Sequence, residues 1–238
     1  MTGLSGIAAF IVFTSVALAQ PAVLLSLRTA PGASLDTDPT SAAWQNARPV
    51  ILDRTAMDQP AGRRTEVRSR WTNDSLQLLF VSSYQSLNLK PNPDTKNETN
   101  QLWNWDVAEA FLGSDFKNIR RYKEFEVSPQ GEWVDLDINL DSAKKEDGWT
   151  WNSGFRTAVR IDRDRKLWIA VMDIPWKSIA SETPAPGMEL RANFYRTEGA
   201  APNTIGMSWR PTHKRTFHAP EAFGILRLAD ESGMSPKK

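Results

Sequence analysis

The chain is divided into short segments in which apolar and polar residues alternate, with turn-forming residues between them. Alternation with a period of two places successive side chains on opposite faces of a strand. The segment 132–140 shows this pattern, and Pro129-Gln130-Gly131 separates it from a strand expected at 121–128. Pro suits the second position of a tight turn, and Gly tolerates the positive φ that follows. Because helical periodicity is scarce, the sequence predicts an all-β, antiparallel β-sandwich with one or two short helices.

Further strands follow from the same signals. A second hairpin is expected where 155–162 and 166–174 flank Arg163-Asp164-Arg165, and Pro175-Trp176 should open a short helix. The segment 105–112 has the pattern of a central strand. We expect additional strands at 44–53, 65–71, 76–84, 188–196 and 223–228, and polar loops at 54–64 and 85–101.

The composition excludes some classes of function. The chain has 29 Lys and Arg against 28 Asp and Glu, and so a net charge of +1. Without a block of basic residues, nothing indicates a nucleic-acid partner. The absence of cysteine excludes disulfides, thiolate metal sites and cysteine nucleophiles. The 10 Trp residues suit both a core and a flat binding platform.

The N-terminal residues are typical of a secretory signal peptide. Ile7 to Val16 form an apolar run, and Ala17-Leu18-Ala19 fits a cleavage site that leaves Gln20 as the new N-terminus. An uncleaved anchor and a core element are the alternatives. Nothing later reaches the roughly 18 apolar residues that a membrane helix needs. We therefore expect a secreted or periplasmic protein with a signal peptide at 1–19, an irregular lead-in at 20–39, one domain at 40–229 and a disordered tail at 230–238.

The hairpin at 121–140 carries a candidate acidic surface. If Val127 pairs with Glu132, one face holds two aromatic residues and four carboxylates: Tyr122, Glu124, Glu126, Trp133, Asp135 and Asp137. The opposite face of the second strand would then turn to the core through Val134, Leu136, Ile138 and Leu140. The acidic face could be a carbohydrate groove, a cation site or a solvated surface neutralised by Arg. A glycosidase would need two such carboxyl groups across the scissile bond.

Glu109 is predicted to lie among large apolar side chains. In the segment 105–112 it shares a face with Trp105, Val107 and Phe111. A buried carboxylate needs a partner, and Arg196 is the candidate by charge. The pair could offer hydrogen bonds to ligand hydroxyls, or it could be a structural ion pair.

His213 and His218 are the only histidines, which is few for a histidine-based metal site. His218 precedes Ala219-Pro220 in a loop, and we expect it to make a structural hydrogen bond. A haem-binding electron-transfer domain would need axial ligands such as Met and His in one pocket. Met172 and Met207 are available together with the two histidines.

A series of short motifs occurs in a characteristic order along the chain. They are Trp44–Ala47, Thr65–Trp71, Trp105–Phe111, Tyr122–Gly131, Ile174–Trp176, Arg191–Arg196, Ser208–Trp209 and Phe217–Gly224. Together they resemble the family 9 carbohydrate-binding modules, in particular the family 9-like secreted bacterial proteins with a DOMON-type sandwich. The resemblance covers roughly residues 40–229.

The resemblance implies a jelly-roll type β-sandwich that binds sugars between two Trp rings, and structural calcium is possible. Trp71 resembles one half of this clamp and Trp209 the other, with Trp105 in reserve. Glu109, Asn193 and Arg196 fall where hydrogen-bonding residues would be expected.

We therefore expect a secreted, non-catalytic protein that binds plant-type polysaccharides such as xylan or cellulose and is associated with carbohydrate catabolism. The DOMON resemblance also admits a haem-binding domain, and the acidic residues admit a glycoside hydrolase, as alternatives.

Overall fold

The computed structural model describes residues 22–32, 34–142 and 145–233 of the chain. The predicted signal peptide lies outside these residues, as does most of the predicted tail. The strands are β1 (Val23–Arg28), β2 (Val50–Thr55), β3 (Pro60–Trp71), β4 (Ser75–Ser83), β5 (Val107–Gly113), β6 (Arg121–Val127), β7 (Trp133–Asn139), β8 (Arg156–Asp162), β9 (Leu167–Pro175), β10 (Glu189–Glu198), β11 (Ile205–Ser208) and β12 (Gly224–Ala229). The helices are α1 (Ala42–Gln45) and α2 (Trp176–Ile179), with 3-10 turns η1 (Leu102–Asn104), η2 (Lys145–Thr150) and η3 (Pro220–Ala222).

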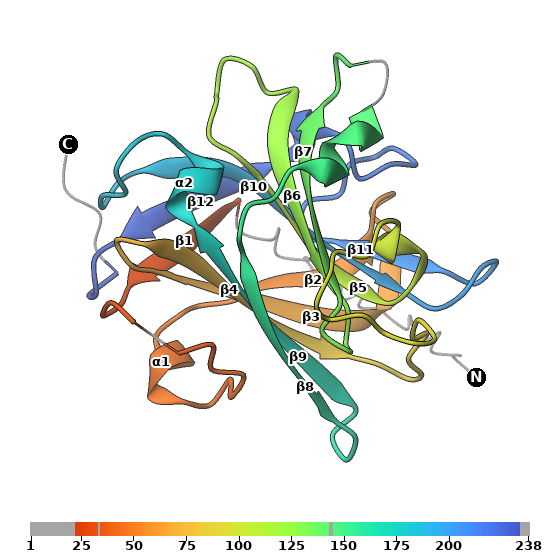
Figure 1. Cartoon of the computed structure of the whole chain (residues 1–238). Coiled ribbons are helices and arrows are strands. Elements are labelled where there is room, and N and C mark those ends of the chain that lie inside the picture. The colour runs from red at the N-terminus through yellow and green to blue at the C-terminus, as the bar shows by residue number, and fades with distance from the viewer. Residues whose placement is uncertain (1–21, 33, 143–144, 234–238) are drawn as a thin grey trace, which may run out of the picture.

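The strands form two layers that cross each other (Figure 1). One layer has the order β7-β6-β5-β10, with β12 also paired to β10, and the other has the order β2-β3-β4-β9-β8. β11 joins β10 to β2, and β1 joins β12 to β3, so the two layers are hydrogen-bonded to each other twice within one 12-stranded sheet. The predicted all-β sandwich with two short helices is confirmed.

β1 makes the sheet mixed rather than purely antiparallel. It pairs in parallel with both β12 and β3, whereas the other strand pairs are antiparallel. The sequence predicted an irregular lead-in here because residues 26–39 contain Pro, Gly, Ser and Asp. Its strand structure depends on partners that lie far away in the chain.

Two predicted boundaries also differ. The strand expected at 44–53 begins at Val50, because Trp44 lies in α1, where its indole N–H donates to the carbonyl of Asp36 at 2.8 Å. The loop expected at 54–64 shortens to a turn between β2 and β3. Both predicted hairpins and the central position of β5 are confirmed.

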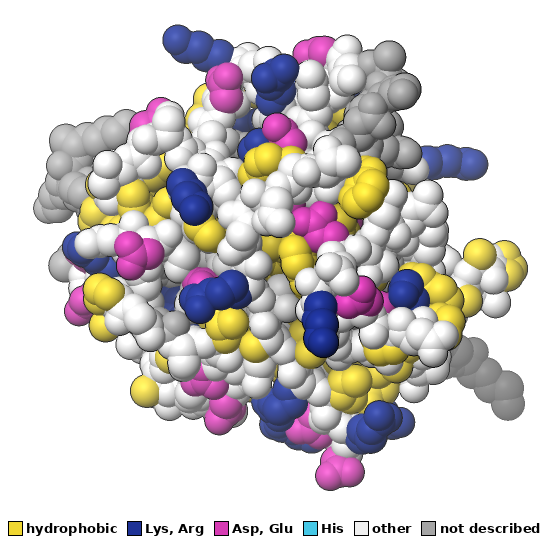
Figure 2. Space-filling model, in the orientation of Figure 1, with side chains coloured by type: hydrophobic (Ala, Val, Ile, Leu, Met, Phe, Trp, Pro, Cys, Tyr) yellow, Lys and Arg dark blue, Asp and Glu magenta, His cyan; other side chains and the backbone are white. Residues whose placement is uncertain are grey.

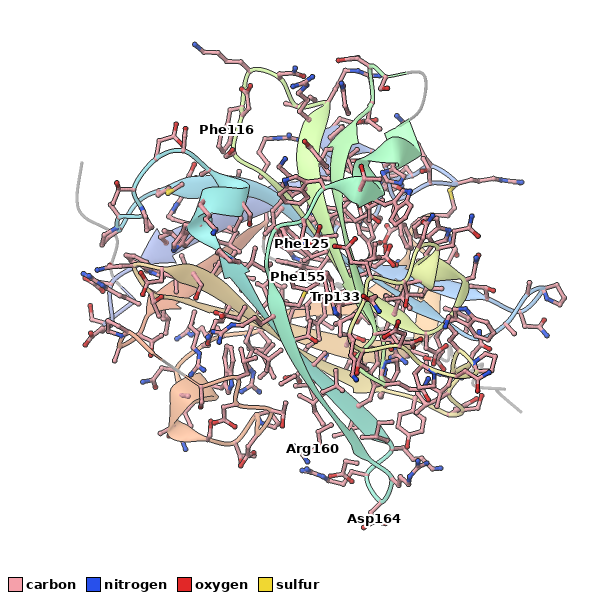
Figure 3. All side chains as sticks on the ribbon, in the orientation of Figure 1. Phe116, Phe125, Trp133, Phe155, Arg160 and Asp164 are labelled. Carbon is pink, nitrogen blue, oxygen red and sulfur yellow. The ribbon has the colours of Figure 1, made fainter. Side chains whose placement is uncertain are left out.

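The main core lies between the two layers. Its largest fully buried side chains include Trp71, Trp168 and Trp209, and Phe194 stacks on Trp209 with ring centroids 5.5 Å apart. Phe155, just before β8, contacts Phe125 and Trp133 of the other layer with ring centroids 5.3 and 5.5 Å away (Figure 3). Burying a large apolar side chain contributes roughly 1.5–3 kcal/mol. These aromatic residues therefore hold the two layers together.

Charged side chains of both signs are interspersed over the visible surface (Figure 2). This agrees with the near balance of 29 basic and 28 acidic residues. A surface that carries charges of both signs does not attract a strongly charged partner to one particular face.

Candidate functional site

A cavity of about 340 Å³ lies on the face of the β5–β6–β7 layer that turns away from the main core. The strands contribute Glu109, Phe111, Glu124, Leu136 and Thr197 to its lining. The 3-10 turn η1 contributes Trp103, and the loops contribute Thr204, Phe217 and His218. The cavity therefore combines apolar walls with carboxylate and hydroxyl groups, as small-molecule sites commonly do.

The strand register brings the carboxylates together. In β5 and β6, Glu109 lies directly opposite Glu126, and Glu124 is two residues away on the same face. One ligand oxygen from each of these three residues lies within 4.8 Å of the others. Sugar hydroxyls or a hard cation could both bind such a group of oxygens.

The predicted register of the β6–β7 hairpin is wrong by one residue. Val127 pairs with Trp133, not with Glu132. A shift of one residue moves every side chain to the other face. Tyr122, Glu124 and Glu126 therefore share their face with the apolar residues of β7, while Trp133, Asp135 and Asp137 lie on the opposite face. Instead of a solvated acidic surface, the hairpin has buried carboxylates in an apolar setting.

The partner predicted for Glu109 is also wrong. Glu109 is 2% exposed and accepts a hydrogen bond from the Thr197 hydroxyl at 3.1 Å. Arg196 projects to the other face of β10, where it donates to the carbonyl of Ser83 at 2.5 Å and to Glu198 at 2.8 Å. Its burial lowers its pKa to about 10. The predicted Glu109–Arg196 pair is thus replaced by a Glu109–Thr197 hydrogen bond.

Burial controls the protonation of the three carboxylates. It raises the pKa of Glu109 well above its usual range, and the charge of Glu124 adds to the effect. The pKa of Glu126 is raised by burial and then by the charges of Glu109 and Glu124. Burial also raises the pKa of Glu124, to about 7. At neutral pH Glu124 is close to its pKa and can therefore gain or lose a proton when a ligand enters the cavity.

Aromatic packing shapes the wall beside the carboxylates. Phe217 stacks on Tyr195 with ring centroids 4.2 Å apart and an interplanar angle of 13°. The Tyr195 hydroxyl donates to the carbonyl of Phe217 at 2.9 Å. These two contacts position the Phe217 ring, which is half-buried at the cavity.

His218 makes the structural hydrogen bond that the sequence predicted. Its Nδ1 lies 2.7 Å from the hydroxyl of Tyr122, and its ring centroid lies 5.3 Å from that of Phe111. Of the four haem-ligand candidates, all of which are described, only His218 lines the cavity. Met172 and Met207 are fully buried in the main core, and His213 lies on an exposed loop.

The two residues assigned to the Trp clamp lie in the main core. Trp71 is 0% exposed, and its indole N–H donates to the carbonyl of Ala229 at 2.8 Å. Trp209 is also 0% exposed and stacks on Phe194. Trp105, the reserve candidate, is half-buried between η1 and β5. Among these three, none lines the cavity.

Asn193 is close to the site but is fully engaged by the chain. Its amide donates to the Tyr195 hydroxyl at 2.7 Å and to the carbonyl of Arg210 at 2.9 Å. Its Oδ1 accepts hydrogen bonds from the backbone N–H groups of Phe194 and Arg210. This geometry makes Asn193 a residue that positions Tyr195 and the following loop.

The sequence did not identify four of the residues that line the cavity. These are Trp103, Thr197, Thr204 and Phe217. Trp103 stands two residues before Trp105 in an aromatic run, and Phe217 opens the Phe217–Gly224 motif, so both had a weak signal. Glu124 is predicted on an acidic face, whereas in the structure it is buried opposite Leu136 of β7. Loop residues follow no periodicity, so their convergence on one cavity cannot be read from spacing.

Comparison with known proteins relates this fold to sugar-binding modules. The model of the carbohydrate family 9 binding domain-like family matches residues 36–231. A family 9 carbohydrate-binding module of Caldicellulosiruptor kristjanssonii in complex with cellotriose superimposes with a TM-score of 0.62 at 14% identity, covering 91% of this chain and 99% of that one. A structure of such a module from the same organism with glucose gives a TM-score of 0.63 at 15% identity, covering 91% and 98% of the two chains. At these identities the likeness shows a shared fold.

The sequence comparison found relatives of two kinds, an extracellular protein and pullulanases. An extracellular protein of Arthroderma benhamiae is 24% identical over 221 residues, which cover 84% of this chain and 95% of the relative. Pullulanase A of Streptococcus pneumoniae is 23% identical over 167 residues, or 68% of this chain and 13% of the pullulanase. The chain thus corresponds to a small part of that enzyme.

Among the described residues, none of the helices has the length and apolar character to cross a bilayer. The family match covers nearly all of the two-layered sandwich, including the strands and loops that line the cavity. The chain therefore belongs to the carbohydrate family 9 binding domain-like family.

Proposed function

We propose that the protein binds carbohydrate in the cavity between Trp103 and the β5–β6 carboxylates. The observation that carries this proposal is the combination of two half-buried aromatic rings, Trp103 and Phe217, with Glu109, Glu124 and two threonine hydroxyls in one lining. The C–H face of a sugar ring packs on aromatic surfaces, and its hydroxyls bond to carboxyl and hydroxyl oxygens. This lining offers both kinds of contact.

The proposed ligand is the end unit of a xylan- or cellulose-type chain, or a short oligosaccharide derived from one. A volume of about 340 Å³ is at the lower end of the range for small-molecule sites, so it suits a terminal sugar better than a long segment. The related modules were solved with cellotriose and glucose, which supports this ligand class. The extracellular relative and the expected signal peptide support a secreted or periplasmic protein acting in carbohydrate catabolism.

The geometry gives less support to the two alternatives from the sequence. A haem site would require the candidate Met and His residues in one pocket, and they are dispersed. A glycoside hydrolase requires carboxyl groups on both sides of the scissile bond. The three glutamates instead lie side by side on adjacent strands of one wall.

Calorimetric titration with xylo- and cello-oligosaccharides tests the proposal. We expect Trp103→Ala to weaken binding by about tenfold or more, which corresponds to about 1.4 kcal/mol, because it removes a stacking surface. Trp149→Ala is the matched control, since Trp149 is exposed and is not part of the cavity lining. The proposal fails if no oligosaccharide binds at millimolar concentration, or if Trp103→Ala binds as tightly as the unchanged protein.

A further inference from the structure

β8 forms an edge of the sheet that the chain leaves unpaired. In the part of the chain that the structure describes, β8 pairs with β9 along Arg156–Asp162 and with no other strand. The turn of the β8–β9 hairpin projects beyond the body of the sandwich, at the bottom of Figure 1. The free edge of β8 therefore presents backbone N–H and C=O groups to which another strand can pair.

The strand at the other end of the sheet order, β7, is covered by its own chain. The backbone N–H of Thr99 donates to the carbonyl of Trp133 at 2.9 Å. The turn η2 lies so close to β7 that a Cβ on Gly148 would overlap the backbone of Asp137. Among the described residues, none makes a comparable backbone hydrogen bond to β8. β8 also contains no Pro and no Lys, and its register with β9 has no bulge, so these common obstacles to strand addition are missing.

The sequence of β8 is complementary to itself when two copies run antiparallel. Directly opposite residues of antiparallel strands project to the same face and interact. If Val159 lies opposite its own copy, Arg156 of each strand lies opposite Asp162 of the other, which gives two pairs of opposite charge. Sliding the copies by two residues places Arg156 opposite Arg160 in one direction, and Arg160 opposite its own copy in the other. Charge therefore favours the register centred on Val159.

An open groove beside this edge suits the apolar side chains of a second copy. It has a volume of about 370 Å³, and Trp133 and Phe155 form part of its lining together with Thr157 of β8. The face of β8 that carries Val159 and Ile161 is turned to the main core. In the register centred on Val159, Ile161 of the second copy lies opposite Thr157 and thus beside the groove. The pairing would bury apolar side chains on this face and join opposite charges on the other.

We propose that two copies of the chain associate through β8, each extending the sheet of the other around a two-fold axis at Val159. Arg156 is available for this contact, because its side chain is 69% exposed. Its Nε and Nη2 bind Asp173, which leaves Nη1 to donate to Asp162 of the second copy. A single strand pair is a small interface, and interfaces under about 1,200 Å² are typical of transient association. The dimer should therefore form reversibly as the protein concentration rises.

The proposed dimer does not involve the sugar cavity. None of the residues that line the cavity belongs to β8. The dimer would thus carry two separate cavities, and its existence does not depend on whether either of them binds carbohydrate.

Sedimentation velocity from micromolar to millimolar concentration tests the proposal on the chain predicted to begin at Gln20, which contains all the described residues. We expect the unchanged protein to shift from monomer to dimer over this range. Arg156→Glu and Asp162→Arg should each weaken dimerisation by about tenfold or more, because two attractive pairs become repulsive. The double variant restores both pairs and should regain the dimer. Arg163→Glu is the control, since it makes the same change of charge in the exposed turn after β8 and should dimerise normally.

The double variant also separates loss of the interface from loss of the fold. Both single changes remove an ion pair within the chain, to Asp173 or to Arg165. Damage to the fold would therefore be at least as large in the double variant, whereas the proposed register predicts its recovery. Melting temperatures of the variants measure this damage directly.

Crosslinking locates the contact. The chain contains no cysteine, so a single introduced thiol reports one position. Val159→Cys should give a disulfide-linked dimer on oxidation, because opposite Cα atoms of antiparallel strands lie about 4.5–5.5 Å apart, within the span of a disulfide. Asp164→Cys, in the exposed turn, is the control and should crosslink far less.

Three results would overturn the proposal. They are a monomer at every concentration, a double variant that stays as monomeric as the single variants, and a Val159→Cys protein that crosslinks no better than Asp164→Cys. All arms omit sugar, so a failure of carbohydrate binding leaves the result intact.

Discussion

Asp106 carries an energetic cost at neutral pH. It is fully buried just before β5, and its Oδ1 accepts a hydrogen bond from the backbone N–H of Gly199 at 2.7 Å. Its Oδ2 is buried without a hydrogen-bond partner. Burial raises its pKa to about 6, although the Gly199 hydrogen bond and the charge of Arg196 act in the opposite direction. The hydrogen bond orders the loop after β10, and the charged form reduces stability.

This balance predicts a pH-dependent effect of Asp106→Asn. Because the folded-state pKa lies above the unfolded value of about 3.9, the folded state binds the proton more tightly, and stability is lost as the pH rises from about 4 to about 6. Asparagine keeps the acceptor for Gly199 and does not titrate. The variant should therefore gain roughly 1–2 kcal/mol relative to the unchanged protein between pH 4 and pH 7.

Thermal melting at several pH values measures this difference. Asp164→Asn, in the exposed β8–β9 turn, is the control and should change little (Figure 3). A stability difference between Asp106→Asn and the unchanged protein that is constant across the pH range would contradict the prediction.

At the scale of single elements, the β6–β7 hairpin shows which features of a hairpin the sequence can predict. Its strands and its turn were predicted from alternation and from Pro129-Gln130-Gly131. The register depended on whether the turn is closed by Ser128 or Val127, since hairpin loops of three and four residues are both common. The structure closes it at Ser128, whose N–H donates to the carbonyl of Glu132 at 2.9 Å, with Gly131 at φ 88°. Closure at Ser128 thus determines that Glu124 and Glu126 share a face with apolar residues of β7.

The candidate site was less predictable than the fold for a related reason. Glu109 could be recognised because it interrupts an apolar strand pattern. Trp103 comes from the short 3-10 turn η1 and Phe217 from a loop, where its contacts with Tyr195 position it. Trp71 and Trp209 have the residue type of a sugar clamp, but both rings are buried in the core, Trp71 at the end of β3 and Trp209 just after β11. Residue type and order therefore identified the family, while exposure required the three-dimensional structure.

β12 begins with a glycine that its surroundings require. A Cβ at Gly224 would lie 2.5 Å from Cη2 of Trp209 and 2.8 Å from the carbonyl oxygen of Ala22. We expect Gly224→Ala to lower the free energy of unfolding by about 1–3 kcal/mol, because the indole or the backbone must move. Denaturant unfolding measures the loss.

Trp209→Phe supplies the matched background for this substitution. It removes the ring atoms that a new Cβ would meet, so Gly224→Ala should cost less there than in the unchanged protein. Equal costs in the two backgrounds would show that the Trp209 contact is not responsible.

For the whole molecule, β1 is the segment that links the two layers on one side. It buries Leu24, and its Ser26 hydroxyl accepts a hydrogen bond from Ser69 of β3 at 2.8 Å. Without it, β12 and β3 would each present an unpaired edge. The stability of the sandwich therefore depends on a segment outside the domain boundaries that the sequence predicted.

Truncation tests this dependence. A chain that begins at Thr29 should lose at least about 3 kcal/mol of stability, or roughly 10 °C in melting temperature, relative to a chain that begins at Gln20. Differential scanning calorimetry compares the two. Equal melting temperatures would mean that β1 adds little to the cohesion of the layers.

The parallel pairing of β1 with β12 also determines how the molecule would bear tension. The pairs run from Val23 opposite Ile225 to Leu27 opposite Ala229, so the N-terminal end of β1 and the C-terminal end of β12 lie at opposite ends of the ladder. A pull on the two ends of the chain would slide these strands past each other in shear. The hydrogen bonds of the ladder would then share the load together instead of opening one after another.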